Sequence, residues 1–123
     1  MAKTVMLELE FSAQMGARYC LAMASVGHAL ATALRAVGVK PGDKVLTNAF
    51  TLAPVPGAIA SVGAVPVFVG VTDGLVIDLE NLAAKAGQAD VLMLSHMRGH
   101  IVDMDALMQL AQAHNLLVIE DCA

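Results

Sequence analysis

The stretch KVLTNAFTLAPVPGAIASVGAVPVFVG, residues 44–70, decides the fold that we expect. It begins with an apolar run, 44–50, that is typical of a buried strand, and it ends with a second such run, 64–70. The residues between them, 54–62, predict a helix with prolines near its start, where a missing amide donor costs least. Strand, helix and strand in succession indicate a parallel sheet.

The same alternation continues on both sides of this stretch. Ser25, Asp78 and Asp103 are candidate N-caps of three further helices, the first of which ends near Gly38. The helix that Asp103 begins covers 103–114, and the other expected elements are a helix over 5–15 and strands over 18–24, 89–95 and 116–120. Because the strands are continuous apolar runs, we expect a mostly parallel sheet covered on both faces, a three-layer α/β/α fold.

The composition indicates apolar surface that the chain cannot bury alone. Hydrophobic residues make up 58% of the sequence and charged residues 15%, whereas soluble domains contain roughly 45–50% and 25%. A partner subunit, further chain or a membrane would cover the excess. Residues 45–72 contain no charge and are long enough for a membrane span, but three prolines and three glycines interrupt them. We therefore expect no membrane span and keep a membrane-associated protein as an alternative.

Charge and cysteine content narrow the class further. The net charge is −4, no basic cluster occurs, and the aromatic residues are one Tyr and three Phe, so we expect no nucleic-acid partner. The first residues lack the pattern of a secretory signal, which favours a cytoplasmic protein. Cys20 and Cys122 are then expected as thiols, each buried in an apolar strand as a small hydrophobe.

Polar residues follow several of the expected strands. In open α/β sheets, ligands bind outside the carboxyl ends of the strands. A carboxylate at the end of a central strand, such as Asp121, is costly unless a positive group meets it; Arg98 is the obvious fixed cation, and a bound cationic cofactor would answer the cost better. The residues at these strand ends are Ser25, Gly27 and His28; Asn48 and Thr51; Ser95, His96, Arg98 and Gly99; and Glu120 and Asp121.

Each of these residues also has a structural interpretation. Ser25 is explained equally well as a helix cap, His28 as an ordinary surface or core histidine, and residues 95–100 as a solvated loop. His96 and His100 are four residues apart, but the intervening Gly99 argues against a helical metal pair and no third ligand is evident. We expect no metal site.

Four segments of the chain occur in a recognisable order: RYCLAMASVGHALATAL, GVKPGDKVLTNAFTLAPVPGAIASVGAVPVFV, LSHMRGHIVDMDALMQLAQAH and LLVIEDCA. Together they resemble the DegT/StrS-like (sugar) aminotransferases, a family of fold-type I pyridoxal phosphate (PLP) enzymes. The resemblance covers nearly the whole chain, and its motifs are specific as a set. It implies that residues 1–123 are the N-terminal portion of the PLP-binding large domain, without the remainder of that domain or the small domain.

The resemblance implies that Asp121 accepts a hydrogen bond from the pyridinium nitrogen of PLP and keeps the ring protonated. It places Ser25, Gly27 and His28 at the phosphate-binding turn, where the family usually has a serine or asparagine followed by Gly-Thr. Val26 and Gly27 depart from that pattern, so the threonine hydroxyl contact is lost while backbone amides remain to hold phosphate.

Four more residues match positions near the cofactor in the resembled family. Thr51 matches its threonine, and Leu52 stands where an aromatic residue often covers the cofactor ring. His96 begins a match to the H-x-x-G loop, and Arg98 replaces an aromatic residue there. These side chains are further candidate cofactor contacts, ranked below Asp121.

The lysine that forms the Schiff base in this family lies downstream of the matched aspartate. Neither Lys3, Lys40, Lys44 nor Lys85 matches it. The expectation is therefore a fragment, inactive by itself, of an enzyme that moves an amino group from an amino acid to a keto-sugar or similar carbonyl compound. The full-length protein would be a homodimer. Two alternatives remain: a non-catalytic α/β binding or assembly module, and a PLP-dependent sugar dehydratase, whose distinguishing residue stands at the lysine position.

Overall fold

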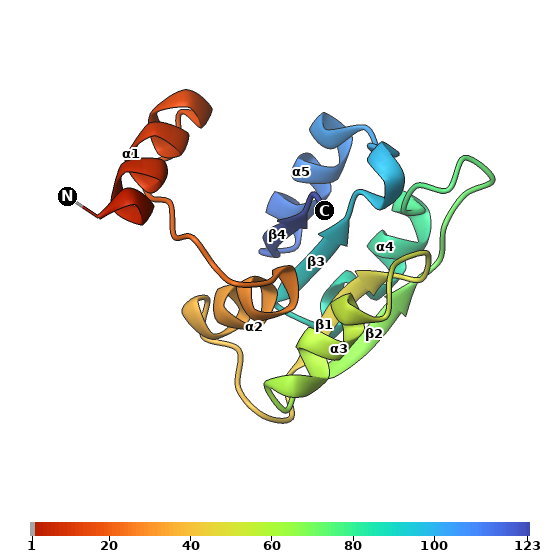
Figure 1. The fold of residues 1–123 in the computed structure, drawn as a ribbon. Helices are drawn as coiled ribbons and strands as arrows, with labels where there is room; N and C mark the ends of the chain where they lie inside the picture. Colours follow the sequence, from red (N-terminus) through yellow and green to blue (C-terminus); the bar gives the residue numbers. More distant parts are fainter. Residues whose placement is uncertain (1) are drawn as a thin grey trace.

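A computed structural model describes residues 2–123, which form a four-stranded sheet flanked by helices (Figure 1). The fold class expected from the sequence, α/β with a parallel sheet, is confirmed. The elements in chain order are α1 (Lys3–Met15), α2 (Val26–Ala36), β1 (Lys44–Asn48), α3 (Pro54–Ser61), β2 (Val65–Val69), α4 (Leu79–Lys85), the 3-10 helix η1 (Ala86–Gln88), β3 (Val91–Ser95), the 3-10 helix η2 (Met97–Gly99), α5 (Met104–Ala113) and β4 (Leu117–Asp121).

The strand order in the sheet is β2-β1-β3-β4, and every neighbouring pair is parallel. The chain leaves β1 toward β2 on one side and returns to β3 on the other side. The connections after β1 and β3 therefore diverge at the carboxyl ends of these strands. Such a switch point is where open α/β sheets form their ligand crevice.

Two apolar cores lie on opposite faces of the sheet, as the continuous apolar strands predicted. Alternation along β1 sends Val45 to one face and Leu46 to the other. The first core joins Val45, Val91 and Met93 to α2 and α3, and the second joins Leu46, Leu92 and Leu94 to α4, α5 and their connections.

Local sequence signals set the helix ends as expected. The side chain of Ser25 accepts a hydrogen bond from the His28 amide at 3.3 Å and begins α2. Asp78 begins α4 through the amides of Glu80 and Asn81, and Asp103 begins α5 through that of Ala106. Pro54 and Pro56 lie in the first turn of α3, where no intrahelical amide donor is lost. Pro66 lies on β2, an edge strand, where a missing amide donor is tolerated.

The turn between α3 and β2 requires glycine at position 63. Gly63 has a φ of 80°, and a Cβ atom there would lie 2.9 Å from the Cβ of Pro41. The Gly63 carbonyl also accepts a hydrogen bond of 2.8 Å from the amide of Gly42. This contact joins the turn before β1 to the turn before β2 and aligns the start of the two strands.

The expected strand over 18–24 is wrong. These residues form an extended connection that pairs with no strand within the described chain, and Tyr19 is 82% exposed. An apolar run becomes a strand only where a neighbouring backbone bonds to it. Cys20 and Cys122 are both free thiols, as expected. The expectation that each is buried in a strand is wrong, because Cys20 lies half-buried in this connection and Cys122 is exposed beyond β4.

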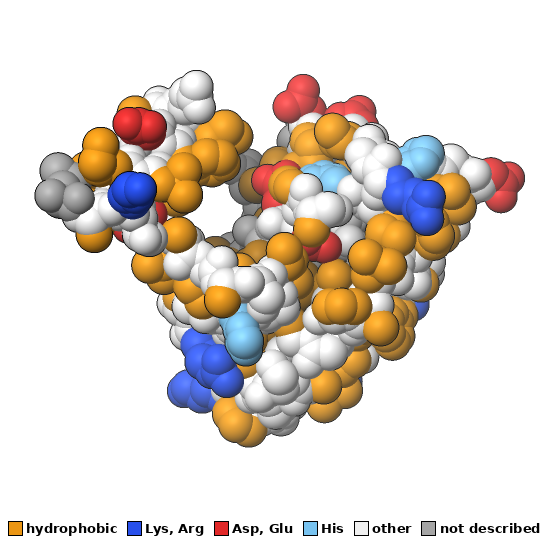
Figure 2. Space-filling view, in the orientation of Figure 1, with side chains coloured by type: hydrophobic (Ala, Val, Ile, Leu, Met, Phe, Trp, Pro, Cys, Tyr) orange, Lys and Arg blue, Asp and Glu red, His pale blue; other side chains and the backbone are white. Residues whose placement is uncertain are grey.

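Helix α1 forms where the sequence predicted a helix, but it buries none of its residues. Its apolar side chains, Leu7, Phe11 and Met15 among them, are exposed, and Figure 2 shows hydrophobic side chains over a helix that stands apart from the sheet. The Glu8 carboxylate accepts a hydrogen bond of 2.8 Å from the amide of Ala22 and so links α1 to the connection that follows it.

Residues 45–72, the candidate membrane stretch, form β1, α3 and β2. No helix in the described part of the chain is long and apolar enough to cross a membrane. The stretch therefore does not form the single spanning helix on which that alternative was built.

Candidate active site

The side chain of Asn48 joins the two central strands where their connections diverge. Its Nδ2 donates hydrogen bonds to the carbonyl oxygens of Ser95 and Phe50, each at 3.0 Å, and its Oδ1 accepts one of 2.8 Å from the Ser95 amide. The residue is fully buried at the last position of β1. Asn48 thus satisfies backbone groups that the end of the ladder leaves open, and it fixes the base of the crevice.

Asp121 is the buried charge of this crevice. Only 7% of the residue is exposed. Its Oδ2 accepts a hydrogen bond of 2.9 Å from the Ser95 hydroxyl, and its Oδ1 accepts one of 3.2 Å from the amide of Ala123. Within residues 2–123 the one ion pair is that between His96 and Glu120, so no cationic side chain meets the Asp121 carboxylate.

A pocket of about 230 Å³ opens over the Asp121 carboxylate, and we call it the Asp121 pocket. Its walls are mostly aliphatic and come from the start of α2, the start of α3 and the ends of β3 and β4. A carboxylate in such surroundings favours a ligand that presents a positive charge or a strong donor beside an apolar surface. The lining residues are Val26, Leu30, Leu52, Pro54, Val55, Ser95, Met97, Asp121 and Ala123.

A second pocket, of about 260 Å³, lies between α2 and α3. We call it the Ser25 pocket; Ser25, Gly27 and His28 line it, and Pro54 lines both pockets. The first amides of α2 have no partner within the helix, which leaves donors available at this end. The Ser25 hydroxyl and the Nδ1 of His28 lie 3.0 Å apart, so the two side chains are held together at the helix start.

Thr51 and Leu52 follow β1 in the loop that leads to α3. Leu52 is 58% exposed and forms part of the wall of the Asp121 pocket. The Thr51 hydroxyl is buried and has no hydrogen-bond partner among the described residues. Buried hydroxyl groups are usually hydrogen-bonded, so this group has bonding capacity to spare.

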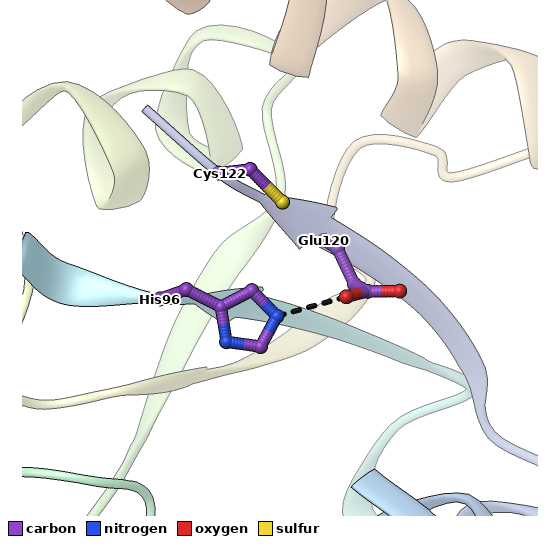
Figure 3. A group of neighbouring side chains, drawn as sticks. All are labelled: His96, Glu120 and Cys122. Atoms are coloured by element: carbon purple, nitrogen blue, oxygen red, sulfur yellow. Dashed lines mark hydrogen bonds and ion pairs between the residues drawn. The ribbon is translucent and has the colours of Figure 1, made fainter. Parts of the chain in front are cut away.

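His96 lies on the opposite face of the sheet from the Asp121 pocket. Alternation along β3 and β4 sends Leu94, His96 and Glu120 to the α4 and α5 side, whereas Ser95 and Asp121 face α2 and α3. The Nε2 of His96 lies 2.8 Å from Oε2 of Glu120 (Figure 3). The His96 amide donates to the Asp121 carbonyl oxygen at 2.9 Å.

Arg98 is exposed within η2, with a φ of 54°. Neither Arg98 nor His96 is among the residues that line the Asp121 or Ser25 pocket within the described chain. The structure therefore places Asp121 and Leu52 in one pocket and Ser25, Gly27 and His28 in its neighbour. The other predicted contacts, Thr51, His96 and Arg98, line neither pocket.

Ser95 and Asn48 lie at predicted strand ends but were not predicted as site residues. Ser95 pairs in register with Asp121, so the two side chains point to the same face and meet. The contact could have been predicted from the last residues of β3 and β4 only if the order and register of these strands had been known. The sequence pattern supplies neither the order nor the register.

The described lysines lie away from both pockets. Lys44 begins β1 and therefore lies at the opposite end of the sheet from the crevice. The Nζ of Lys85 donates to the carbonyl oxygen of Phe68 at 2.6 Å. No lysine of residues 2–123 lines the Asp121 pocket or the Ser25 pocket.

The thiol of Cys122 lies beside this site in an acidic environment. Partial burial raises its pKa, and the negative charges of Glu120 and Asp121 raise the pKa further because they oppose a thiolate. The thiol form of Cys122 is thereby favoured at neutral pH.

A family model described as the DegT/DnrJ/EryC1/StrS aminotransferase family matches residues 2–123. The chain belongs to this aminotransferase family. Structures of Spr1654 from Streptococcus pneumoniae, solved in a PLP form and a PMP form, share its fold over 100% of the chain at a TM-score of 0.90 and 26% identity. The family's cofactor is therefore pyridoxal phosphate.

Two relatives are more similar in sequence. The UDP-N-acetyl-3-dehydro-α-D-glucosamine 3-aminotransferase of Acidithiobacillus ferrooxidans is 39% identical over 121 residues, which are 95% of this chain and 32% of that protein. The crystal structure of S. venezuelae DesV is 32% identical at a TM-score of 0.93, covering 100% of this chain and 34% of that one. The chain thus spans about a third of the length of the relatives that it matches.

Proposed function

We propose that residues 1–123 are the N-terminal portion of the large domain of a PLP-dependent aminotransferase, and that Asp121 is the residue that holds the cofactor ring. The observation that carries the proposal is the Asp121 carboxylate itself. It is buried, it is aimed into an apolar pocket, and no cationic side chain of the described residues pairs with it. A protonated pyridine ring offers the positive N–H group that such a carboxylate needs.

The two adjacent pockets fit a ligand that has a ring at one end and a phosphate at the other. The ring would lie in the Asp121 pocket, between Leu52 and the other aliphatic walls, with its nitrogen toward Asp121. The phosphate would lie toward the Ser25 pocket, where amides at the start of α2 and the Ser25 hydroxyl are donors. The unpaired Thr51 hydroxyl, in the loop that joins β1 to α3, is a further hydrogen-bond donor.

Pyridoxal phosphate, when bound, supplies an electron sink for the carbon that carries the transferred amino group. The chain's own contribution begins with Asp121, which would keep a proton on the ring nitrogen. Ser95 donates to Oδ2 of Asp121 and fixes the direction of the carboxylate, and Asn48 fixes the backbone of Ser95. Leu52, Leu30 and Val55 exclude water from the ring face, which strengthens the attraction between the two charges.

The substrates that we propose are an amino acid as donor and a keto-sugar or similar carbonyl compound as acceptor. The activity after which the A. ferrooxidans relative is named supports this class. We further propose a cytoplasmic homodimer, in which a partner subunit and the remaining parts of the fold cover the apolar side chains that residues 2–123 leave exposed.

Cofactor binding and transamination test the proposal separately. In the full-length protein that contains these residues, supplied with PLP, L-glutamate and a nucleotide-linked keto-sugar, we expect formation of 2-oxoglutarate. Asp121→Asn should retain PLP in equilibrium dialysis while turnover falls by about two to three orders of magnitude, because the ring loses its charge partner. The matched control is Asp103→Asn, which makes the same change of charge at the exposed N-cap of α5, a residue that lines neither pocket.

Two results would contradict the proposal. Unchanged turnover in Asp121→Asn would remove this residue from the mechanism. Failure of the parent protein to retain PLP in dialysis would remove the cofactor assignment and leave a non-catalytic α/β module as the better description.

A further inference from the structure

His96, Glu120 and Cys122 form a cluster of potential metal ligands on the face of the sheet opposite the Asp121 pocket. Their ligand atoms, the imidazole nitrogen, a carboxylate oxygen and the thiol sulfur, all lie within 4.8 Å of one another. Figure 3 shows the His96 ring facing the Glu120 carboxylate, with Cys122 beside them. Cys122 belongs to the chain end beyond β4, so a spacing search within the 95–100 loop could not find it.

Strand geometry explains why these three residues meet. Glu120 and Cys122 are two residues apart in an extended segment, so their side chains point to the same face. Leu94 pairs with Glu120 and Ser95 with Asp121 in the parallel register, and His96 follows directly on the neighbouring strand. Two adjacent backbones therefore hold the cluster, and its formation does not depend on a flexible loop alone.

We propose that His96, Glu120 and Cys122 bind a divalent transition metal, with zinc as the best match. Imidazole and thiolate ligands select zinc and cobalt over magnesium or calcium, which prefer oxygen ligands. On binding, the thiol of Cys122 releases its proton to solvent and His96 binds as the neutral imidazole. Three protein ligands with a water in the fourth position are an arrangement that zinc accepts.

Small movements bring the cluster to metal geometry. In a tetrahedral zinc site, nitrogen, oxygen and sulfur ligand atoms are about 3.4–3.6 Å apart. The His96 and Glu120 atoms, now 2.8 Å apart in their hydrogen bond, must separate slightly, while the sulfur moves closer. Glu120 has a side chain that is 47% exposed and Cys122 is exposed, so both can adjust while the buried His96 stays in place.

The metal would lie directly behind the residue proposed to hold the cofactor. Asp121 stands between two of the ligands in sequence, with its side chain on the other face. A bound ion would tie the end of β4 to the residue after β3 and thereby restrict movement of the Asp121 backbone. This inference goes beyond the aminotransferase proposal and does not depend on it.

Cobalt(II) is the probe that reports ligand identity directly. When Co(II) is titrated into the reduced, tag-free protein, we expect a saturable near-ultraviolet thiolate-to-cobalt charge-transfer band and intense visible bands of a tetrahedral site. Added Zn(II) should displace the cobalt and abolish both. Cys122→Ser should remove the charge-transfer band. Glu120→Gln should weaken Co(II) binding at least ~100-fold, because loss of a direct ligand costs as much affinity as loss of a residue that only orients a ligand, or more.

Matched controls come from equivalent residues outside the cluster. Cys20→Ser removes the other thiol, and His100→Gln removes an exposed histidine of the same loop. Both should keep the wild-type cobalt spectrum and affinity. Circular dichroism checks that each variant is folded. Glu120 and Cys122, the residues changed in the two decisive variants, have exposed side chains outside both apolar cores.

A charge-transfer band that persists in Cys122→Ser would overturn the proposal, as would its loss in Cys20→Ser. The absence of any tetrahedral cobalt spectrum in the folded parent protein would also overturn it. None of these results bears on PLP retention, so failure here and failure of the aminotransferase proposal are distinguishable.

Discussion

Ser95 acts on the candidate active site through another residue. Its hydroxyl donates to a carboxylate that is almost fully buried, and its backbone is held on both sides by Asn48. A hydrogen bond to a buried charged group contributes more to stability than one between neutral groups, because the charge has lost its hydration. We therefore regard Ser95 as a positioning residue for Asp121.

Ser95→Ala should lower the free energy of unfolding by about 1.5–3 kcal/mol, because it leaves Oδ2 of Asp121 without its donor. The matched control is Ser61→Ala, which removes a hydroxyl that bonds only to the carbonyl of Ala58 in its own helix, at 2.7 Å. That change should cost less than about 1 kcal/mol. Chemical denaturation measures both, and equal losses would show that the Asp121 contact adds nothing.

At the residue scale, the sequence allowed Asp121 to be found and left Ser95 unassigned. A carboxylate that ends an apolar strand is conspicuous by itself, since its burial costs energy wherever the strand lies. A serine is not, because its role depends on which strand is adjacent and in which register. The same limitation applies to His96. The family resemblance made it a candidate cofactor contact, and alternation along β3 places its ring on the face of the sheet opposite the Asp121 pocket.

Turns between elements control how the strands start together. At Gly63 two requirements coincide, a positive φ and a close approach to Pro41. At Gly42 only the first applies, since its φ is 90° and no atom lies within 4 Å of the position of a Cβ. The pair therefore separates backbone strain from a steric clash.

Gly42→Ala should lower the free energy of unfolding by about 1–2 kcal/mol through its left-handed backbone alone. Gly63→Ala should lower it by about 1–3 kcal/mol more, because the new methyl group meets the Pro41 ring. Thermal and urea denaturation of the two variants give the comparison. If both lose the same stability, the Pro41 contact relaxes without cost.

Elements were predictable where their signals are local. The caps Ser25, Asp78 and Asp103 act on amides within three residues, so each helix start could be found from the sequence. The strand predicted over 18–24 failed for the opposite reason. Whether an apolar segment becomes a strand depends on a distant backbone, and none of the described strands lies beside this one.

For the whole molecule, the composition predicted apolar surface without a cover, and the structure locates it. Helix α1 and the connection after it carry many of the large exposed hydrophobic side chains, Leu9 and Tyr19 among them, while the two cores beside the sheet are closed. The stability of the chain should therefore come from the sheet and the four helices packed on it rather than from α1.

Leucine-to-alanine substitutions test this division. Leu107, fully buried in α5, should cost about 2–5 kcal/mol when replaced by alanine, because a cavity remains in the core. Leu9 is 57% exposed on α1, and Leu9→Ala should change the free energy of unfolding by less than about 0.5 kcal/mol. A large loss at Leu9, measured by urea denaturation of the same chain, would mean that α1 packs against the protein in solution.

The strand order β2-β1-β3-β4 has a consequence for how such a scaffold can change. The hollow between β1 and β3 exists because the polypeptide turns to opposite sides there, whatever side chains line it. Substitutions around the hollow can therefore change which ligand it binds while the strand order that creates it is unchanged. Ligand specificity and fold can thus evolve independently in this protein.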